Sequence, residues 1–490
     1  MTKAASKNST TKGKKLIKVL IPKYCQNELR YILDIMLGEF LGLAFEVEAY
    51  NGDVIEITRL GDSDESSNLA KLTLDASFFH KAHQAWLKSE SMPVLPLANW
   101  TPVDDGINAN LVEPSVPVLY GQPGLVKNGE HLHINLDIFG SAFFMLSRYE
   151  EPITKDRDSH DRFPATASVA YKAGFLDRPI INEYLEILWG CLQQFWPDLK
   201  RKERIFRKLI SCDVDHPFDL VGHSLKKTIL RVGARLIRDK NPKLALFDSL
   251  NYIFKKFDSD RFDEYRNNID WIMKVNSVVG NKVAFYFIPI QTNTSKEGPN
   301  DVRSSKISKL LKHIVDSGHE IGFHPGYDTY KFPENFKKSA NALKEAFKKE
   351  RIEFSNIGGR QHYLRYNIET TPQLWEGNGL TYDTSLSFAD KAGFRTGVCY
   401  EYTMFNLVAR RKMKLKQRPL IVMECSIIAS GYEGLGYSVE AIKRFEYFTN
   451  TCRMFKGNFT LLWHNSYFIS KISKSFYLSV LQHELKINKR

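Results

Sequence analysis

Short apolar runs, separated by longer helical or loop-like segments, form a regular pattern in the second half of the chain. Seven runs with the length of strands follow Lys208, and amphipathic segments at 304–317, 334–349 and 439–455 predict helices between them. This alternation predicts an α/β fold with a parallel sheet, and seven strands favour an incomplete (β/α)7 barrel. The predicted strands are 209–211, 283–288, 320–323, 356–358, 382–385, 420–425 and 459–463.

An open, doubly wound sheet is the alternative arrangement for these elements. A nucleotide-binding version of that sheet would carry a glycine-rich phosphate loop after one of its strands. None of the seven runs is followed by such a loop. The barrel is therefore the preferred prediction.

The first half of the chain predicts a smaller α/β domain. A strand at 16–21, a helix at 27–41 and a strand at 44–50 open it, and an amphipathic helix at 179–196 closes it. The charged and polar segment 197–208 marks the predicted boundary. The predicted organisation is a disordered basic tail at 1–15, an accessory α/β domain at 16–200, a barrel at 205–470 and a C-terminal helix or tail at 471–490.

The composition is that of a globular protein. Apolar residues make up 43% and aromatic residues 12% of the 490 residues, and the length favours two domains. No apolar stretch approaches the roughly 18 residues of a membrane helix, and the N-terminus lacks the apolar segment of a secretory signal. We therefore expect no transmembrane segment and a cytoplasmic location, with the six cysteines reduced and packed. The pattern makes no prediction of oligomeric state.

The formal charge of +13 concentrates anions near the protein but does not name a partner. Part of the charge lies in the tail 1–15 and part in the run 410–416. Neither segment has aromatic residues interleaved with its charges, as a stacking platform for bases requires. We interpret both as solvated and expect no nucleic-acid partner.

Polar side chains lie at or near the C-terminal ends of the predicted strands. Asp213 and Asp215 stand two residues apart, so in a strand they share one face, and two anions that close favour a cation. Parallel barrels gather reactive side chains at the C-terminal rim of the strands, so residues far apart in sequence can meet there. The other members of this set are His324, the segment 360–363, Asp383, Asp390 and His464.

Four of these segments occur in an order found in a known enzyme family. They are Ser-Cys-Asp-Val-Asp at 211–215, His-Glu-Ile-Gly-Phe-His at 319–324, Arg-Gln-His-Tyr at 360–363 and Leu-Trp-His at 462–464. The ordered set resembles the motifs of the polysaccharide deacetylase family, also called the NodB-homology family or carbohydrate esterase family four, over residues 205–470. Residues 137–189 resemble the N-terminal region that accompanies a bacterial branch of this family.

The resemblance implies roles for the first and third motifs. It makes Asp213 the catalytic base and Asp215 a metal ligand, and it makes Arg360 the residue that orients the base. These roles agree with elementary chemistry, because a base held off the metal can take a proton from water, and a paired guanidinium favours the carboxylate form of Asp213.

The resemblance also implies a proton donor and an oxyanion donor. His464 corresponds to the histidine that protonates the departing amine, and Asp390 is a candidate to hold or tune it. Tyr363 corresponds to a residue whose backbone amide binds the oxyanion. An imidazole suits the first role, because an amine leaves poorly until it gains a proton.

The second motif departs from the family pattern. The family has two metal-binding histidines four residues apart, but here His324 is followed by Asp328, with Pro325 and Gly326 between them. The third ligand is therefore either Asp328 or His362, and His362 is slightly favoured. A set of Asp215, His324 and His362 suits one divalent ion such as zinc, cobalt or another transition metal, whereas Asp328 would favour a harder ion.

The resulting hypothesis is a metal-dependent amide hydrolase that removes an acyl group, acetyl above all, from an amino sugar of a surface-polysaccharide precursor. The expected partner is a carbohydrate carried on a nucleotide or on a lipid. One alternative is a hydrolase of a non-sugar carbon–nitrogen bond. The other is a non-catalytic glycan-binding or scaffold protein on the same barrel, which would need neither a base nor an acid.

Overall fold

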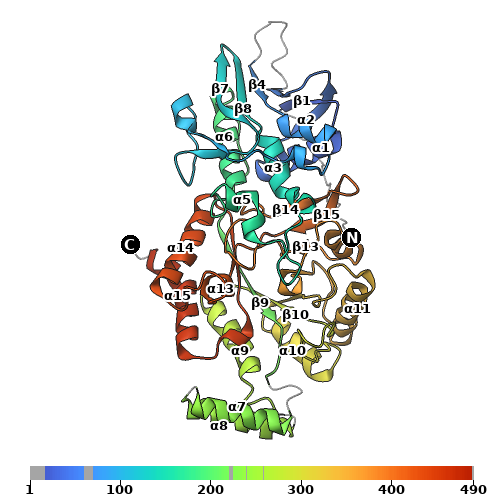
Figure 1. Ribbon diagram of the computed structural model, residues 1–490, viewed down its shortest axis with the longest axis vertical. Helices are drawn as coiled ribbons and strands as arrows, with labels where there is room; N and C mark the ends of the chain where they lie inside the picture. Colours follow the sequence, from blue (N-terminus) through green and yellow to red (C-terminus); the bar gives the residue numbers. More distant parts are fainter. Residues whose placement is uncertain (1–16, 60–69, 220–223, 239, 258, 488–490) are drawn as a thin grey trace, which may run out of the picture. The chain divides into compact units, whose positions relative to one another are not determined.

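A computed structural model describes residues 17–59, 70–219, 224–238, 240–257 and 259–487 of the chain (Figure 1). The predicted basic tail at 1–15 lies outside these residues. The chain divides into two compact units, of which the first comprises Met1–Phe144 and Glu183–Glu203 and the second Met145–Asn182 and Arg204–Arg490. The segment Met145–Asn182, which the sequence assigned to the N-terminal domain, thus groups with the second unit.

The first unit contains a mixed six-stranded sheet with the order β2-β1-β3-β4-β8-β7. Its opening strand, helix and strand lie where the sequence predicted them, and Ile17, Val19 and Ile21 of the first strand alternate into the core. The strands are β1 (Ile17–Pro22), β2 (Phe45–Tyr50), β3 (Ile55–Arg59), β4 (Lys71–Leu74), β7 (Gly121–Asn128) and β8 (His131–Leu136), with a separate pair β5 (Ala98–Trp100) and β6 (Val116–Val118).

The first unit also contains helices, and the last two of them cross the chain positions at which the units are divided. The predicted helix 27–41 is α1 followed directly by one stretch of π-helix, and the predicted helix 179–196 is present as α6. The elements are α1 (Gln26–Leu33), the π-helix Asp34–Phe40, α2 (Ser77–Gln84), α3 (Ile138–Leu146) and α6 (Ile180–Phe195).

All seven predicted strands of the second unit are present and run parallel in one nine-stranded sheet. The sheet order is β14-β15-β13-β12-β11-β10-β9-β17-β16, so the first and last strands of the unit, β9 and β17, are neighbours. The seven strands are β9 (Arg207–Val214), β10 (Val283–Phe287), β11 (Glu320–Phe323), β12 (Gly358–Gly359), β13 (Tyr382–Asp383), β16 (Val422–Met423) and β17 (Asn458–Leu462).

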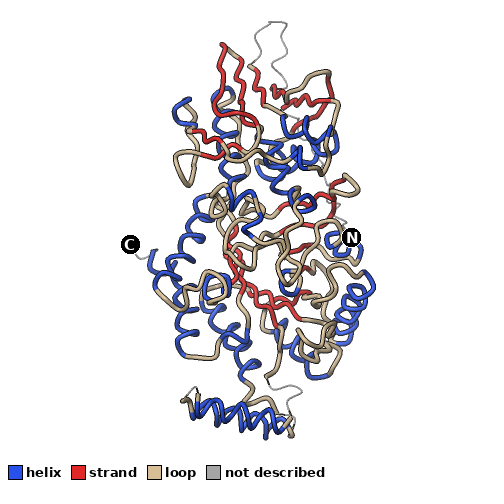
Figure 2. Tube along the Cα trace, in the orientation of Figure 1, coloured by secondary structure: helices blue, strands red, loops and turns tan. Residues whose placement is uncertain are grey.

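The sheet is not closed by hydrogen bonds among the described residues, because β14 and β16 form its two edges. The α/β class is therefore confirmed, whereas closure into an incomplete barrel stays a prediction. Figure 2 shows the strands of this unit in its interior, with helices outside them. The helices are α4 (Glu150–Ile153), α5 (Val169–Lys172), α7 (Leu225–Ile237), α8 (Pro242–Lys255), α9 (Glu264–Val278), α10 (Ser305–Asp316), α11 (Pro333–Lys349), α12 (Thr371–Gly377), α13 (Glu424–Ile428), α14 (Val439–Met454) and α15 (Lys471–Ile487).

The sequence missed an antiparallel hairpin, β14 (Tyr402–Asn406) and β15 (Arg411–Gln417), at one edge of this sheet. The basic run interpreted as merely solvated is strand β15. Its Met413 and Leu415 are buried while Lys412 and Lys414 are exposed, so the run has the two-residue period of a half-buried strand. The high charge of the exposed face hid that alternation.

Aromatic packing holds α11 and α12 against the C-terminal end of β11. Phe323, at the end of β11, lies edge-on against Phe336 of α11 and Trp375 of α12, with ring centroids 5.2 and 5.6 Å apart. All three side chains are buried. Such pairs add to the burial of apolar area and position the end of β11, where the polar side chains begin.

The predictions of packed cysteines and of no transmembrane segment are confirmed in part. All six cysteines are buried and free of disulfides. No helix among the described residues is long and apolar enough to cross a membrane.

A buried ion network explains why Met145–Asn182 groups with the second unit. Glu151 accepts hydrogen bonds from Arg148 Nε at 2.8 Å and from Arg395 at 2.9 and 2.8 Å, and Arg148 also pairs with Glu150 at 2.7 Å. All four side chains are almost fully buried. Two guanidinium groups withdrawn from water depend on these carboxylates.

Replacing Glu151 by glutamine should lower the free energy of unfolding by about 3–5 kcal/mol, because it removes the anion shared by two buried cations. Glu345→Gln is the matched control, since Glu345 pairs with Arg303 at 3.3 Å on the surface and its loss should cost less than about 1 kcal/mol. Urea unfolding of both variants measures the difference. Equal, small losses would show that the network contributes little.

Candidate active site

Asp213 and Asp215 lie at the C-terminal end of β9. The side chain of Val214 between them is fully buried, and both carboxylates turn to the other side. Oδ1 of Asp215 lies 3.2 Å and Oδ2 of Asp213 3.7 Å from the same atom, Nε2 of His324. The strand period therefore delivers both acids to one place, as the sequence predicted.

Two histidines from neighbouring strand ends have their tautomers set by oxygen acceptors. His324 follows β11, and its Nδ1 donates to the backbone carbonyl of Arg360 at 2.6 Å. His362 follows β12, and its Nδ1 lies 3.0 Å from Oε1 of Glu297. A carbonyl or carboxylate oxygen only accepts, so in each neutral ring the proton lies on Nδ1 and Nε2 is the atom that can bind another partner.

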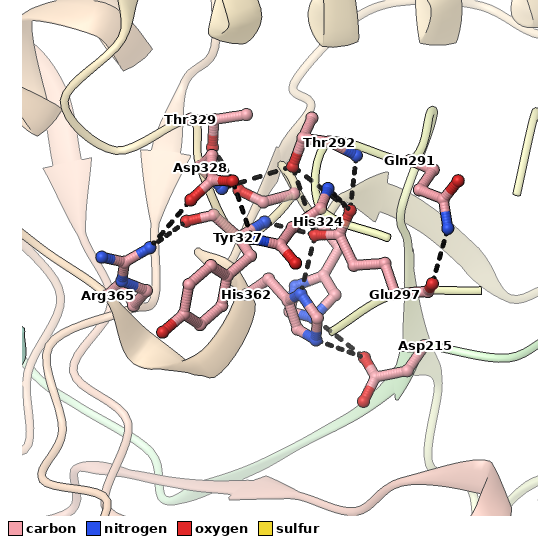
Figure 3. A network of polar contacts seen from close by, with 12 residues as sticks. Asp215, Gln291, Thr292, Glu297, His324, Tyr327, Asp328, Thr329, His362 and Arg365 are labelled. Atoms are coloured by element: carbon pink, nitrogen blue, oxygen red, sulfur yellow. Dashed lines mark hydrogen bonds and ion pairs between the residues drawn. The ribbon is translucent and has the colours of Figure 1, made fainter. Parts of the chain in front are cut away.

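These two Nε2 atoms converge on Asp215 (Figure 3). Oδ1 of Asp215 lies 3.2 Å from His324 Nε2 and 3.6 Å from His362 Nε2, and the donor atoms of all three residues lie within 4.8 Å of one another. Donors at about 2.0–2.1 Å from a tetrahedral ion are separated by about 3.3 Å, so the spacing fits zinc or an ion of similar size.

Two of the converging atoms are buried and make no hydrogen bond. Oδ1 of Asp215 and Nε2 of His324 have no hydrogen-bond partner among the described residues. Buried polar atoms in that condition cost free energy, and a divalent cation bound by all three donors would remove the cost. The donor set of one carboxylate and two imidazoles therefore fits a metal ion.

The charges of the cluster point the same way. Burial would raise the pKa of the Asp215 carboxyl, but the imidazoles of His362, His324 and His464 lower it well below its usual range. Burial would lower the pKa of His362, yet Asp215 and Glu297 raise it to about 9. The site thus has an excess of negative charge, which a proton on His362 or a cation at its Nε2 can balance.

Glu297, which the sequence analysis did not single out, holds His362 in place. It lies on the loop after β10, and its side chain is fully buried. Its Oε2 accepts from the backbone amides of Thr292 at 2.6 Å and Asn293 at 3.1 Å, and its Oε1 accepts from the amide of Tyr327. Burial would raise the pKa of Glu297, but His362 and these amides lower it, so an anion faces His362 Nδ1.

Asp328, the alternative ligand, is not part of this group. Its Oδ2 accepts from Asn293 Nδ2 at 2.9 Å, and its Oδ1 lies 3.3 Å from Arg365 Nη1. The segment after His324 forms no helix, because Pro325 and Gly326 interrupt it, so Asp328 does not return to the face of His324. Figure 3 shows its carboxylate directed at Arg365 instead.

Asp213 is paired with a buried arginine. Arg360 Nη1 donates to Oδ1 of Asp213 at 2.7 Å, and its remaining nitrogens donate to Ser211 Oγ at 3.0 Å and to the carbonyl and hydroxyl of Thr384 at 3.1 and 3.3 Å. The guanidinium also lies over the ring of Tyr286. One carboxylate oxygen of Asp213 is thereby fixed, and Oδ2 stays directed toward His324 and the site.

His464 lies on the opposite side of Asp215, with Nε2 3.9 Å from Oδ2 of that residue. Its partner is Glu424, whose Oε1 lies 2.5 Å from His464 Nδ1 and also accepts from the His464 backbone amide at 2.9 Å. Burial would lower the pKa of His464, but Glu424 raises it well above its ordinary value. Glu424 therefore favours the imidazolium form of His464, whose Nε2 faces Asp215 in the site.

A second group of metal-type donors consists of Glu424, Cys425 and His464. His464 Nδ1 and Glu424 Oε1, the two atoms that could bind a metal there, are already joined by a hydrogen bond. Burial raises the pKa of the Cys425 thiol, which keeps it protonated and disfavours its use as a ligand. This group fits an oriented acid better than a metal site.

Asp390, the predicted partner of His464, serves a different purpose. Its carboxylate accepts from the backbone amide of Ala165 at 3.2 and 3.3 Å. The residue that does contact His464 is Glu424, the first residue of α13 after β16. The acid that contacts His464 is therefore Glu424, whereas Asp390 contacts the Ala165 amide.

Tyr363 lies next to His362 with a left-handed backbone, φ 60°. Its carbonyl accepts from Arg162 Nη1 at 3.1 Å, and its ring packs against His160, with centroids 4.8 Å apart. A non-glycine residue in this conformation is uncommon and is held by its surroundings. The segment around His160 and Arg162 therefore supports the loop that carries His362.

Of two supporting residues, Glu424 and Glu297, only the first could have been found from the sequence. Glu424 stands at the end of the predicted strand 420–425, where the other candidates were chosen. Glu297 carries no such signal, because it lies ten residues beyond the end of β10 in an irregular loop. Its role depends on tertiary contacts alone.

The profile of a family of unknown function, DUF7033, matches residues 17–197. No curated protein matches the chain. Solved structures that are similar include a protein from Mycobacterium smegmatis that is provisionally named a polysaccharide deacetylase, at 13% identity and a TM-score of 0.38 over 58% of this chain and 85% of that one.

Two further solved structures are similar at low identity. One is the Xyl-CE4 domain of a multidomain xylanase from the hindgut metagenome of Trinervitermes trinervoides, at 10% identity and a TM-score of 0.27 over 59% of this chain and 85% of that one. The other is Puue allantoinase, at 14% identity and a TM-score of 0.30 over 45% of this chain and 66% of that one. These identities are too low to transfer an activity to this chain.

Proposed function

We propose that this protein is a metal-dependent amide hydrolase that removes an N-acyl group, acetyl above all, from an amino sugar of a surface-polysaccharide precursor. The observation that carries the proposal is the convergence of Asp215, His324 and His362 on one point, with Asp213 on one side and His464 on the other. The order of the motifs along the chain, which resembles that of polysaccharide deacetylases, supports the same assignment.

In this proposal Asp215, His324 and His362 would hold one divalent ion, zinc or a similar transition metal. A bound ion would supply polarisation of the amide carbonyl and a lower pKa of the attacking water. Asp213 acts as the base, because Oδ1 is held by Arg360 and Oδ2 remains free to take the proton of that water. Asp213 can serve in this way only because Asp215, and not Asp213, belongs to the converging donors.

His464 acts as the general acid. Expulsion of an amine requires a proton, and the raised pKa of His464 favours the protonated ring that supplies it from Nε2. Glu424 orients the ring through Nδ1 and stabilises its charge. The backbone amide of Tyr363 is the proposed donor to the oxyanion, next to the ligand His362.

The proposed substrate is an amino sugar that is attached to a nucleotide or a lipid carrier and is deacylated in the cytoplasm. Acetate release by the purified protein, measured with N-acetylhexosamine derivatives together with its metal content, tests the proposal. Absence of both turnover and stoichiometric metal would favour a non-catalytic glycan-binding protein. Metal with turnover of other amides alone would favour a different carbon–nitrogen hydrolase.

Asp213→Asn should lower kcat by at least about 100-fold while the metal content is retained, because asparagine cannot accept a proton. Asp390→Asn is the matched control and should retain most of the activity, since the Asp390 carboxylate accepts from the Ala165 amide and not from His464 among the described residues. Initial rates of acetate release measure both. Turnover of the Asp213 variant close to that of the wild type would remove the proposed base.

His362→Ala should weaken metal binding by more than the roughly 10–100-fold that loss of an outer partner causes, since it removes a ligand. Asp328→Ala should leave the affinity nearly unchanged, because Asp328 binds Arg365 and Asn293. Competition of each protein with a chromophoric chelator for zinc or cobalt measures the affinities. The reverse ranking would make Asp328 the third ligand.

Glu424→Gln should move the basic limb of the kcat/KM pH profile to lower pH. His464 must be protonated to act as the acid, so activity falls as the pH rises through its pKa, and Glu424 is the main group that raises this pKa. A neutral glutamine removes that support, and activity is lost at a lower pH. The Glu345→Gln protein provides the control profile. An unshifted basic limb in the Glu424 variant would show that the Glu424–His464 pair does not set the pH dependence of catalysis.

A further inference from the structure

The helical hairpin α7–α8 exposes an unusual amount of apolar surface. It occupies the connection between β9 and α9, directly after the Asp213–Asp215 pair (Figure 1). Ile229 is 61% and Ile237 82% exposed. Both helices repeat apolar residues at spacings of four, three and four, which places them along one stripe on each helix. The stripes are Leu225, Ile229, Val232 and Leu236 in α7, and Leu246, Leu250, Ile253 and Phe257 in and just after α8.

The opposite face of the hairpin is ionic and packs inward. Arg231 donates to both carboxylate oxygens of Asp219 at 2.8 and 2.7 Å and to Asp248 of α8 at 3.0 Å. Arg235 lies 3.3 Å from Asp248, which is buried. The hairpin is thus inverted relative to an ordinary surface helix, with ion pairs inside and aliphatic side chains outside. Contiguous exposed apolar surface of this kind marks an interaction site.

The hairpin is also strongly basic. Residues 224–257 contain nine lysines and arginines and two aspartates. Among the described residues of the hairpin Asp248 is the acid, and it is buried in ion pairs, so the outer surface presents cations. Lys226, Lys227, Lys243 and Lys256 are exposed beside the apolar stripes. The occupant of this surface must therefore combine apolar and anionic groups.

A groove of about 450 Å³ opens beside α8 with the same character. Phe247, Phe262 and Phe468 contribute to its lining, together with three lysines and one acid, Lys243, Lys471, Lys474 and Glu264. Ile469, which lines it as well, and Ile472 are exposed nearby at the start of α15. Aromatic and cationic side chains together suit an amphiphile with an anionic headgroup.

We propose that the α7–α8 hairpin docks the protein on the surface of an anionic lipid bilayer. Its helices of 13 and 14 residues are shorter than the roughly 20 residues needed to span a bilayer, so they lie in the interface with their apolar stripes inserted and their lysines at the phosphates. A second copy of the chain fits less well, because pairing two such surfaces would bring their cations together.

The position of the hairpin bears on the substrate, and this step rests on the proposed function. Only nine residues separate Asp215 from Leu225, so the docking surface starts at the same strand end as the site. A protein docked in this way meets its amino sugar on a lipid carrier at the bilayer surface, not on a nucleotide carrier in solution.

Flotation of the full-length protein with vesicles tests the docking surface without any turnover. The probes are phosphatidylcholine vesicles and phosphatidylcholine vesicles with about one third phosphatidylglycerol, at low and high salt. The double variant Ile229→Glu/Leu236→Glu is compared with Val408→Glu/Val439→Glu, whose valines are 61% and 62% exposed outside the hairpin. Thermal unfolding of each variant checks that the fold is retained.

We expect salt-sensitive binding to the anionic vesicles, at least about tenfold weaker for the hairpin variant and unchanged for the control variant. No binding to anionic vesicles, or an equal loss in both variants, would overturn the proposal. A wild-type dimer that the hairpin substitutions dissociate, without vesicle binding, would likewise overturn it and assign the stripes to a second copy.

The carrier is tested separately by acetate release from polyprenyl-diphosphate-linked N-acetylglucosamine in the anionic vesicles and from UDP-N-acetylglucosamine in solution. The hairpin variant should lose rate on the lipid-linked sugar in proportion to its loss of binding. An unchanged rate there would overturn the lipid carrier. If neither sugar reacts while vesicle binding stands, the proposed function fails and the docking surface does not.

Discussion

The candidate site depends on where two imidazole protons are held. The Nδ1–H groups of His324 and His362 each donate a hydrogen bond to an oxygen, one to a backbone carbonyl and the other to Glu297. With this tautomer both Nε2 atoms, which face Oδ1 of Asp215, can bind a cation. A rotated ring or the other tautomer would place a proton at that point and leave no room for a cation.

Arg360 connects this arrangement to the sheet. Its side chain joins Asp213 and Ser211 of β9 to Thr384, which follows β13. Its own backbone carbonyl accepts a hydrogen bond from His324. One buried residue thus positions the proposed base and one of the proposed ligands. A lysine could not replace it, because a single ammonium group lacks the planar set of donors that reaches all these acceptors.

Much of the second unit could be predicted from sequence, because its strands are short, buried and separated by amphipathic helices. All seven parallel strands were found that way, and so was the meeting of Asp213, Asp215, His324 and Arg360 at their ends. The hairpin β14–β15 was missed, because lysines on its outer face masked a two-residue period.

The roles of residues that act through tertiary contacts could not be predicted from the local sequence pattern. Asp390 and Glu424 are both acids near strand ends, and only the packed structure shows that Glu424 contacts His464. Glu297 gains its role from three loop amides that no sequence pattern connects to it. The choice between Asp328 and His362 likewise depends on the direction of the loop after Pro325.

The separation of the converging donors along the chain has a consequence of its own. Two histidines on one helical turn would tie an ion to a single local segment, whereas Asp215, His324 and His362 come from three segments, the first and second more than a hundred residues apart. An ion held by them would act as a long-range crosslink that restricts the unfolded chain far more than a local clip does. Occupancy and folding of the second unit would then be thermodynamically coupled.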